Sequence, residues 1–194
     1  MPRRETKRGA ERTPIDGEVD VLVCGASFAG LTVARELAGS GARVLVLDRY
    51  EIGERQTSAC AAPTEWLEAM GVAGSLRQTF DTLVIHTPDT TARFRLPWTF
   101  STFDYRELCG LLWEQCDADF ETATVNGINR ATSSAPALNQ LSAATPRTSD
   151  AAPASGRARS EHGGPLSIET DRGIISAPLV VDALGWKRVL GGLG

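Results

Sequence analysis

The chain has 194 residues, of which 42% are hydrophobic and 23% charged, as in a soluble globular protein. Its net charge of −4 gives no global reason to expect nucleic-acid binding. No window approaches the roughly 18 apolar residues that a membrane span needs. The four cysteines, Cys24, Cys60, Cys109 and Cys116, form no C-x-x-C pair and no metal-like cluster with the two histidines. This usage predicts free thiols in a reducing cytoplasm and no metal site.

The first 16 residues are rich in Arg and Lys but contain no apolar run, so they are not a secretory signal. We expect residues 1–16 to be a disordered basic tail. A basic arm that touches a membrane surface or nucleic acid is the alternative that the sequence leaves open.

A strand, a helix and a second strand are predicted between residues 19 and 48. VDVLVC (19–24) is the apolar run of a strand covered on both faces, and ARVLVLD (42–48) is a second one. Between them, SFAGLTVARELA (27–38) has apolar residues at helical spacing and is ended by a Gly-Ser-Gly break. This arrangement is typical of a βαβ unit.

The next elements are shorter. PTEWLEAMG (63–71) predicts a short helix, and LVIHT and ARFRL, on either side of Pro88 and Asp89, predict a hairpin. Asp104 and Glu107 have capping-box spacing before a helix in YRELCGLLWEQC (105–116). FETATV (120–125) is a predicted strand.

The composition then changes to Ala, Ser, Thr and Pro without any sustained period. Such a segment cannot bury enough apolar area to offset its ordering entropy, so residues 131–165 are expected to be a disordered insertion. Beyond it, LSIETDRGIIS (166–176) predicts a hairpin and APLVVDALG (177–185) a buried strand that ends in a glycine turn. The expected fold class is therefore α/β, a Rossmann-like domain with a mainly parallel sheet and a β-meander excursion, divided into residues 17–130 and 166–194.

The turn between the first strand and its helix has two of the three glycines of the G-x-G-x-x-G fingerprint. Gly25 allows the sharp turn, and Gly30 allows close packing of helix and strand. Ser27 replaces the middle glycine, which is tolerable if its φ is negative, and its hydroxyl could cap the helix or donate to a phosphate. Asp48 ends the second strand, where a carboxylate can accept both ribose hydroxyls of an adenosine and repels a 2′-phosphate. A βαβ unit without a ligand, in which Asp48 merely caps a turn, is the alternative.

From Val19 to Arg49 the sequence resembles the N-terminus of FAD-dependent oxidoreductases of the glutathione-reductase-like superfamily, most closely its geranylgeranyl-reductase and aromatic-hydroxylase-like branch. The Asp48-Arg49 pair resembles that family's E/D-R pair. TFDYRELCGLLWEQC (102–116) resembles the helix whose early arginine, here Arg106, lies against the flavin. LVVDALG (179–185) resembles the second FAD motif, although Leu184 replaces a small polar residue.

The resemblance covers roughly residues 17–130 and 166–194 and implies FAD bound in an extended form. Its adenosine would lie on Asp48 and its pyrophosphate on the turn at residues 25–30. Members of this family normally continue with a substrate-binding sheet and a later G-D motif, so we expect this chain to be the N-terminal half of a longer enzyme. The implied cofactor-binding residues are Gly25, Ala26, Ser27, Phe28, Ala29, Gly30, Asp48, Arg49, Arg106, Asp182, Ala183 and Gly185.

The implied function is an FAD-dependent oxidoreductase, either an NAD(P)H-linked monooxygenase or a reductase of an unsaturated, lipid-like substrate. The expected partners are a small, apolar substrate and NAD(P)H as electron donor, with no nucleic acid and no membrane span. A non-catalytic nucleotide-binding remnant or partner-binding module is the alternative. An NAD-dependent dehydrogenase is disfavoured, because it has no reason to carry the Arg106 and Ala183-Gly185 features in this order.

Other candidates are less specific. Cys60 lies where the family approaches the flavin edge, so it is either a flavin-contacting thiol or a small buried residue. The cluster in RLPWTFSTFDY (95–105), with Trp98, Phe100, Phe103 and Tyr105, favours a hairpin core over a substrate pocket. Arg55 is either a pyrophosphate contact or an exposed loop arginine. Neither His86 nor His162 has a partner that indicates a base, and no catalytic residue is assigned, since flavin carries its own redox chemistry.

Overall fold

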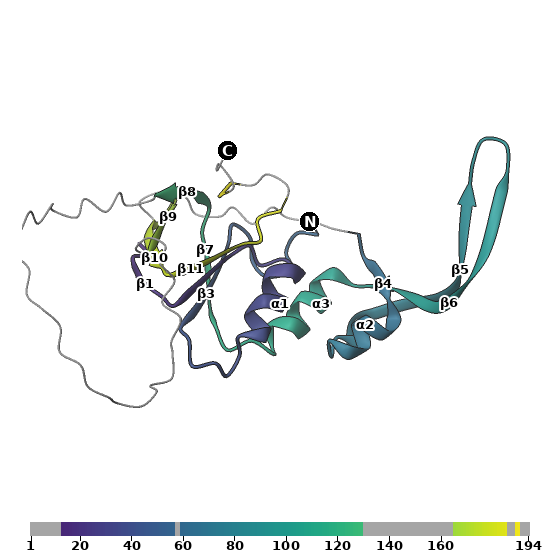
Figure 1. Cartoon of the computed structure of the whole chain (residues 1–194), viewed down its shortest axis with the longest axis horizontal. Coiled ribbons are helices and arrows are strands. Elements are labelled where there is room, and N and C mark those ends of the chain that lie inside the picture. Colours follow the sequence, from purple (N-terminus) through teal and green to yellow (C-terminus); the bar gives the residue numbers. More distant parts are fainter. Residues whose placement is uncertain (1–12, 57–58, 130–164, 186–188, 191–194) are drawn as a thin grey trace, which may run out of the picture.

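The computed structural model describes residues 13–56, 59–129, 165–185 and 189–190. A parallel sheet in the order β11-β2-β3-β7 forms its centre. Helix α1 connects β2 to β3, and Figure 1 shows α3 running beside α1. This confirms the expected α/β fold class, with a mainly parallel sheet. The elements of this layer are β2 (Val21–Cys24), α1 (Phe28–Glu36), β3 (Val44–Asp48), α3 (Tyr105–Trp113), β7 (Asp119–Thr122) and β11 (Leu179–Asp182).

A second sheet has the order β1-β10-β9-β8, in which β8, β9 and β10 are antiparallel neighbours. This is the expected β-meander. FETATV (120–125) was predicted as one strand, but the structure divides it between two. Residues 120–122 belong to β7 and Val125 begins β8, because the chain turns from one sheet to the other at Ala123 and Thr124. The strands are β1 (Gly17–Glu18), β8 (Val125–Asn129), β9 (Leu166–Thr170) and β10 (Gly173–Ala177).

The expected insertion at residues 131–165 lies outside the described residues, apart from Pro165, and so do residues 1–12 of the expected tail. The rest of that tail contacts the β9–β10 turn. The amide of Ile15 donates to the carbonyl of Arg172 at 2.9 Å, and Asp16 accepts from the amide of Ile174 at 2.8 Å.

The third sheet has the order β4-β6-β5, and its long hairpin projects from the body of the molecule (Figure 1). The hairpin was expected around Pro88 and Asp89, but its strands are about twice as long as the predicted runs. Opposite residues in its register share a face, so Leu83 and Phe94 lie on one side and are 45% and 52% exposed. The elements of this part are β4 (Ala61–Pro63), α2 (Thr64–Ala69), the short 3₁₀ helix η2 (Ala73–Ser75), β5 (Leu76–His86) and β6 (Thr91–Phe103).

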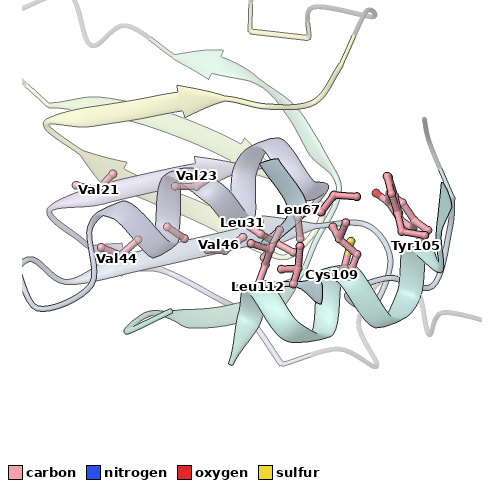
Figure 2. Close-up of a cluster of buried hydrophobic side chains, with 14 residues drawn as sticks. Val21, Val23, Leu31, Val44, Val46, Leu67, Tyr105, Cys109 and Leu112 are labelled. Carbon is pink, nitrogen blue, oxygen red and sulfur yellow. The ribbon is translucent and has the colours of Figure 1, made fainter. Parts of the chain in front are cut away.

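The main core lies between the parallel sheet and helices α1, α2 and α3, as Figure 2 shows. Val21 and Val23 of β2 and Val44 and Val46 of β3 face Leu31 of α1, with other members from α2 and α3. The opposite side of the sheet packs on the meander. Both faces of β2 are therefore covered, which explains its unbroken apolar run. In the part of the chain that the structure describes, no helix is long and apolar enough to cross a membrane.

Candidate nucleotide-binding site

A cavity of about 480 Å³ opens where the parallel strands end. It lies at the carboxyl ends of β2, β3, β7 and β11, the edge at which open α/β sheets bind ligands. Seven residues of the predicted cofactor site line it: Ala26, Ser27, Phe28, Asp48, Arg49, Ala183 and Gly185. The other lining residues are Tyr50, Glu51, Gly53, Arg55, Tyr105, Ala123, Thr124, Val125, Leu184 and Val189.

The two glycines of the turn are required by close packing. Gly25 has φ of +113°, and a Cβ atom there would lie 2.3 Å from the carbonyl oxygen of Ala183. A Cβ on Gly30 would lie 1.9 Å from the carbonyl oxygen of Gly25. Both glycines therefore hold the start of α1 directly against the end of β11, beneath the cavity.

Ser27 takes the place of the middle glycine with φ of −75° and ψ of 172°, so no left-handed backbone is needed there. It occupies the N-cap position of α1, but its side chain makes no cap hydrogen bond. Of the two roles expected for its hydroxyl, helix capping is not observed, and donation to a phosphate stays a prediction; Ser27 is among the residues that line the cavity. The first amides of α1 have no partner within the helix, and with the helix dipole they favour an anion at this point.

Asp48 ends β3 beside this turn. Its Oδ2 accepts from the amide of Ala26 at 2.8 Å, and its Oδ1 accepts from the amide of Tyr50 at 3.0 Å. Each carboxylate oxygen retains acceptor capacity for a ligand hydroxyl. Asp48 lies on the cavity wall, and its bond to the Tyr50 amide is the turn contact of the alternative, so ribose binding stays a prediction.

The loop after β3 brings two cations to the cavity. The guanidinium carbons of Arg49 and Arg55 lie 5.0 and 4.9 Å from the centre of the Tyr50 ring, and Arg55 donates to the Tyr50 hydroxyl at 2.5 Å. Arg55 lines the cavity and is also exposed on its loop, so its place fits both alternatives. Tyr50 was missed, because a tyrosine after an E/D-R pair carries no signal in a single sequence.

The part of the cavity wall formed by Ala123 to Val125 was also missed. The amide of Ala123 donates to the carbonyl of Asp48 at 2.7 Å, and the amide of Thr124 donates to Asp171 at 2.7 Å. The signal was present in the predicted strand at 120–125: its carboxyl end must lie at the same edge of a parallel sheet as Asp48.

The second predicted FAD motif lies beside the first. Strand β11 pairs in parallel with β2, which puts Asp182 opposite Cys24. Asp182 accepts from the amide of Leu184 at 3.1 Å, and Gly185 has φ of +82°. Ala183 and Gly185 therefore line the cavity with the unexpected Leu184, whereas Asp182 and Ala29 are not among its lining residues.

Arg106 and Cys60 are not among the lining residues either. Arg106 is in the first turn of α3, where a Cβ on Gly53 of the cavity loop would lie 2.9 Å from its Cα. Cys60 precedes β4 and packs partly buried against the main core. Burial and, after it, the charge of Asp104 raise the pKa of Cys60, so this thiol is not activated as a nucleophile.

The aromatic residues of the predicted cluster at 95–105 differ in burial. Phe103 and Tyr105 are buried in the main core, as the hairpin-core reading expects, but Trp98 is 49% exposed. Tyr105 also lines the cavity. His86 shares a hydrogen bond of 2.9 Å with Thr91 on the exposed hairpin, and His162 lies outside the described residues.

One family model matches part of the chain. Residues 20–64 match the family model described as FAD dependent oxidoreductase. This match contains the glycine turn and Asp48. A search of curated protein sequences found no match.

Three solved structures illustrate the fold similarity. PqsL from Pseudomonas aeruginosa, described as a probable FAD-dependent monooxygenase, is 14% identical with a TM-score of 0.53, and the similarity covers 84% of this chain and 42% of PqsL. A flavoprotein/dehydrogenase from Cytophaga hutchinsonii is 20% identical with a TM-score of 0.57, covering 89% and 40%. The flavin-dependent brominase Bmp2 is 9% identical with a TM-score of 0.58, covering 88% and 39%.

This chain therefore spans less than half the length of the flavoproteins to which it is similar. The described site fits the adenosine and diphosphate half of FAD: a carboxylate for ribose, helix amides for phosphate and a turn that a single Cβ would block. The fold is similar to the matched part of a probable FAD-dependent monooxygenase, and the matched family model names the expected cofactor, FAD.

Proposed function

We propose that this chain is the FAD-binding part of an FAD-dependent oxidoreductase. One observation carries the proposal: the glycine turn, the carboxylate of Asp48 and the start of α1 all meet at a single cavity. The match to the FAD dependent oxidoreductase family over residues 20–64 supports it.

In this proposal the chain's own residues bind and orient the cofactor. Asp48 accepts the ribose hydroxyls, the amides at the start of α1 receive the diphosphate, and Arg49 and Arg55 offset its negative charge. Ala123 to Val125 form the wall against the base. FAD, when bound, supplies the redox chemistry through its isoalloxazine ring.

Within this class we propose a monooxygenase-type enzyme that uses NAD(P)H and a small apolar substrate. The similarity to a probable FAD-dependent monooxygenase and to a flavin-dependent brominase supports that type over a reductase of unsaturated lipids. The geranylgeranyl-reductase resemblance stays a prediction that the comparisons do not support.

The second candidate function is a nucleotide-binding module without turnover. It is favoured by the position of Arg106 and Cys60 outside the cavity lining, because these were the residues expected at the flavin itself. Among the described residues, more groups are placed to contact the adenosine half of the cofactor than its isoalloxazine half.

The test is a binding comparison on the purified chain. FAD, ADP and FMN are titrated separately by calorimetry, and the visible spectrum is recorded after FAD addition and desalting. The proposal expects binding of FAD that outlasts desalting, with weaker binding of FMN, which lacks the adenosine. Equal affinities for FAD and ADP would favour the module, and no binding of either would contradict both candidates.

A further inference from the structure

The turn between β2 and α1 is held in place by the side chain of Asp48, at the end of β3. The amide of Ala26, at the centre of the turn, donates to Asp48 Oδ2 at 2.8 Å. That amide therefore already donates a hydrogen bond within the protein when no ligand is bound. In contrast, the described structure gives no acceptor to the amides of Ser27, Phe28 and Ala29.

The same carboxylate also fixes the cationic loop. Its second oxygen accepts from the amide of Tyr50 at 3.0 Å, and the Tyr50 hydroxyl accepts from Arg55 at 2.5 Å. Asp48 thus links the turn that faces the phosphates to the loop that carries the two arginines. A ribose ligand alone would require neither contact.

We infer that Asp48 is a positioning residue for phosphate binding, in addition to the ribose contact expected of it; this rests on the proposed function. The carboxylate holds the turn so that the amides of Ser27 and Phe28 point to the cavity, while the Ala26 amide is not a phosphate ligand. Like-charge repulsion from the carboxylate acts against phosphate binding, so a net loss of phosphate affinity on removal of this charge would report the positioning role.

Asp48→Asn separates the two roles. An asparagine still offers a ribose one acceptor and one donor, but its single carbonyl oxygen can serve only one of the two amides. The NH2 group of the asparagine would then face the second backbone amide, and because both groups are donors, no hydrogen bond can form between them. If Asp48 served ribose alone, loss of its charge would leave binding of inorganic pyrophosphate unchanged or make it tighter.

The matched control is Asp20→Asn at the opposite end of the same two strands. Asp20 Oδ2 accepts from the amide of Arg43 at 2.7 Å, which is the same kind of bond between the same pair of strands. It lies away from the cavity lining. Its substitution removes one charge and replaces one carboxylate–amide bond by the weaker bond of a neutral acceptor, without touching the turn.

The experiment measures amide exchange by NMR in the ligand-free chain and then titrates inorganic pyrophosphate. In the native chain we expect the Ala26 amide to exchange at least about 10-fold more slowly than those of Ser27 and Phe28, as a charge-assisted bond of this kind gives. In Asp48→Asn, we expect exchange at Ala26 or Tyr50 to rise about 10-fold and pyrophosphate affinity to fall several-fold. Asp20→Asn should change neither.

Unchanged exchange at both amides in Asp48→Asn would overturn the inference, and so would unchanged or tighter pyrophosphate binding, whatever the exchange rates. If Asp48→Asn does not fold, the native chain decides: equal exchange at Ala26 and Ser27 overturns the inference, and slow exchange at Ala26 alone supports it. Failure of the native chain to bind pyrophosphate or FAD would instead contradict the proposed function, and the exchange rates would still report on Asp48.

Discussion

Gly25 and Ala183 lie so close together that a Cβ atom on Gly25 would be 2.3 Å from the carbonyl oxygen of Ala183. They directly follow two neighbouring strands, β2 and β11, which are separated by more than 150 residues in the sequence. The contact joins the two expected FAD motifs into one cavity floor.

Gly25→Val is therefore expected to abolish nucleotide binding. A branched side chain cannot fit against Ala183, and the φ of +113° is strained for any residue with a Cβ. FAD titration of the variant measures the effect, and circular dichroism shows whether it is folded. Gly39→Val is a suitable control, because Gly39 also has a positive φ (+71°) but no atom within 4 Å of its Cβ position. Unchanged FAD affinity in Gly25→Val would refute the site.

The glycine turn, strand β2 and the start of α3 were predicted well from the sequence, because the signals for them are local. The turn glycines, the apolar run of β2 and the capping spacing of Asp104 and Glu107 each depend on neighbours a few residues apart. The cap is observed, since Asp104 accepts from the amide of Glu107 at 3.0 Å. Asp48 could be placed for the same reason, because it ends the strand that follows the helix.

The remaining parts of the site depend on pairing between distant segments. Thr124 reaches the cavity because β3 pairs with β7, and although the strand at 120–125 was predicted, no pattern in the sequence specified that β3 is its neighbour. The long hairpin was underestimated because Pro97 and the threonines interrupt the alternation of β6, which the irregular register with β5 accommodates. Strand length was set by pairing rather than by periodicity.

Ser27→Ala tests whether the serine hydroxyl takes part in phosphate binding. The side chain makes no cap hydrogen bond, so removing the hydroxyl should change the free energy of unfolding by less than about 0.5 kcal/mol. FAD affinity should fall about 5- to 10-fold, the effect of one hydrogen bond of about 1 kcal/mol or slightly more. Thermal melts and calorimetric titrations give the two quantities. A loss of stability with unchanged FAD affinity would show that the hydroxyl is structural.

Asp48→Ala should weaken binding of ADP by about 1–3 kcal/mol, the cost of leaving hydroxyl and amide partners unpaired. The carboxylate accepts from Ala26 and Tyr50 without ligand, so some of this loss should also appear with pyrophosphate. Parallel calorimetric titrations of ADP and pyrophosphate measure the division. An ADP affinity equal to that of the native chain would remove Asp48 from the site.

Arg172→Ala should destabilise the chain by about 1–3 kcal/mol, as expected for loss of several charge-assisted hydrogen bonds. Its side chain is 9% exposed, and it donates to Glu121 at 2.7 Å and to the carbonyl oxygens of Thr122 and Thr13 at 2.8 and 2.9 Å. Urea denaturation measures the change. Arg95→Ala is the control, because that arginine is 86% exposed and its pair with Asp81 should contribute less than about 0.5 kcal/mol. Equal effects of both substitutions would contradict this assignment.

The buried thiol of Cys24 should cause the free energy of unfolding to fall as the pH rises into the alkaline range. Burial and, after it, the charge of Asp182 raise the pKa of the Cys24 thiol to about 12. An unfolded thiol ionises near pH 8.5, so the stabilising effect of keeping Cys24 neutral is fully present below that pH. Above it the unfolded state gains a thiolate that the folded state excludes, and stability falls by about 1.4 kcal/mol per pH unit until the folded pKa is reached.

Cys24→Ala removes this contribution while other alkaline effects, including the raised pKa of Cys109 at about 11, remain the same in both chains. Between about pH 8 and about pH 10, the native chain should lose about 1–2 kcal/mol more of its free energy of unfolding than the variant does. Urea denaturation at the two pH values, with a reducing agent present, measures this difference. The variant is expected to be less stable at the lower pH, because alanine leaves a small cavity beneath the turn. A parallel decline in both chains would mean that the Cys24 thiol ionises in the folded protein and is open to solvent.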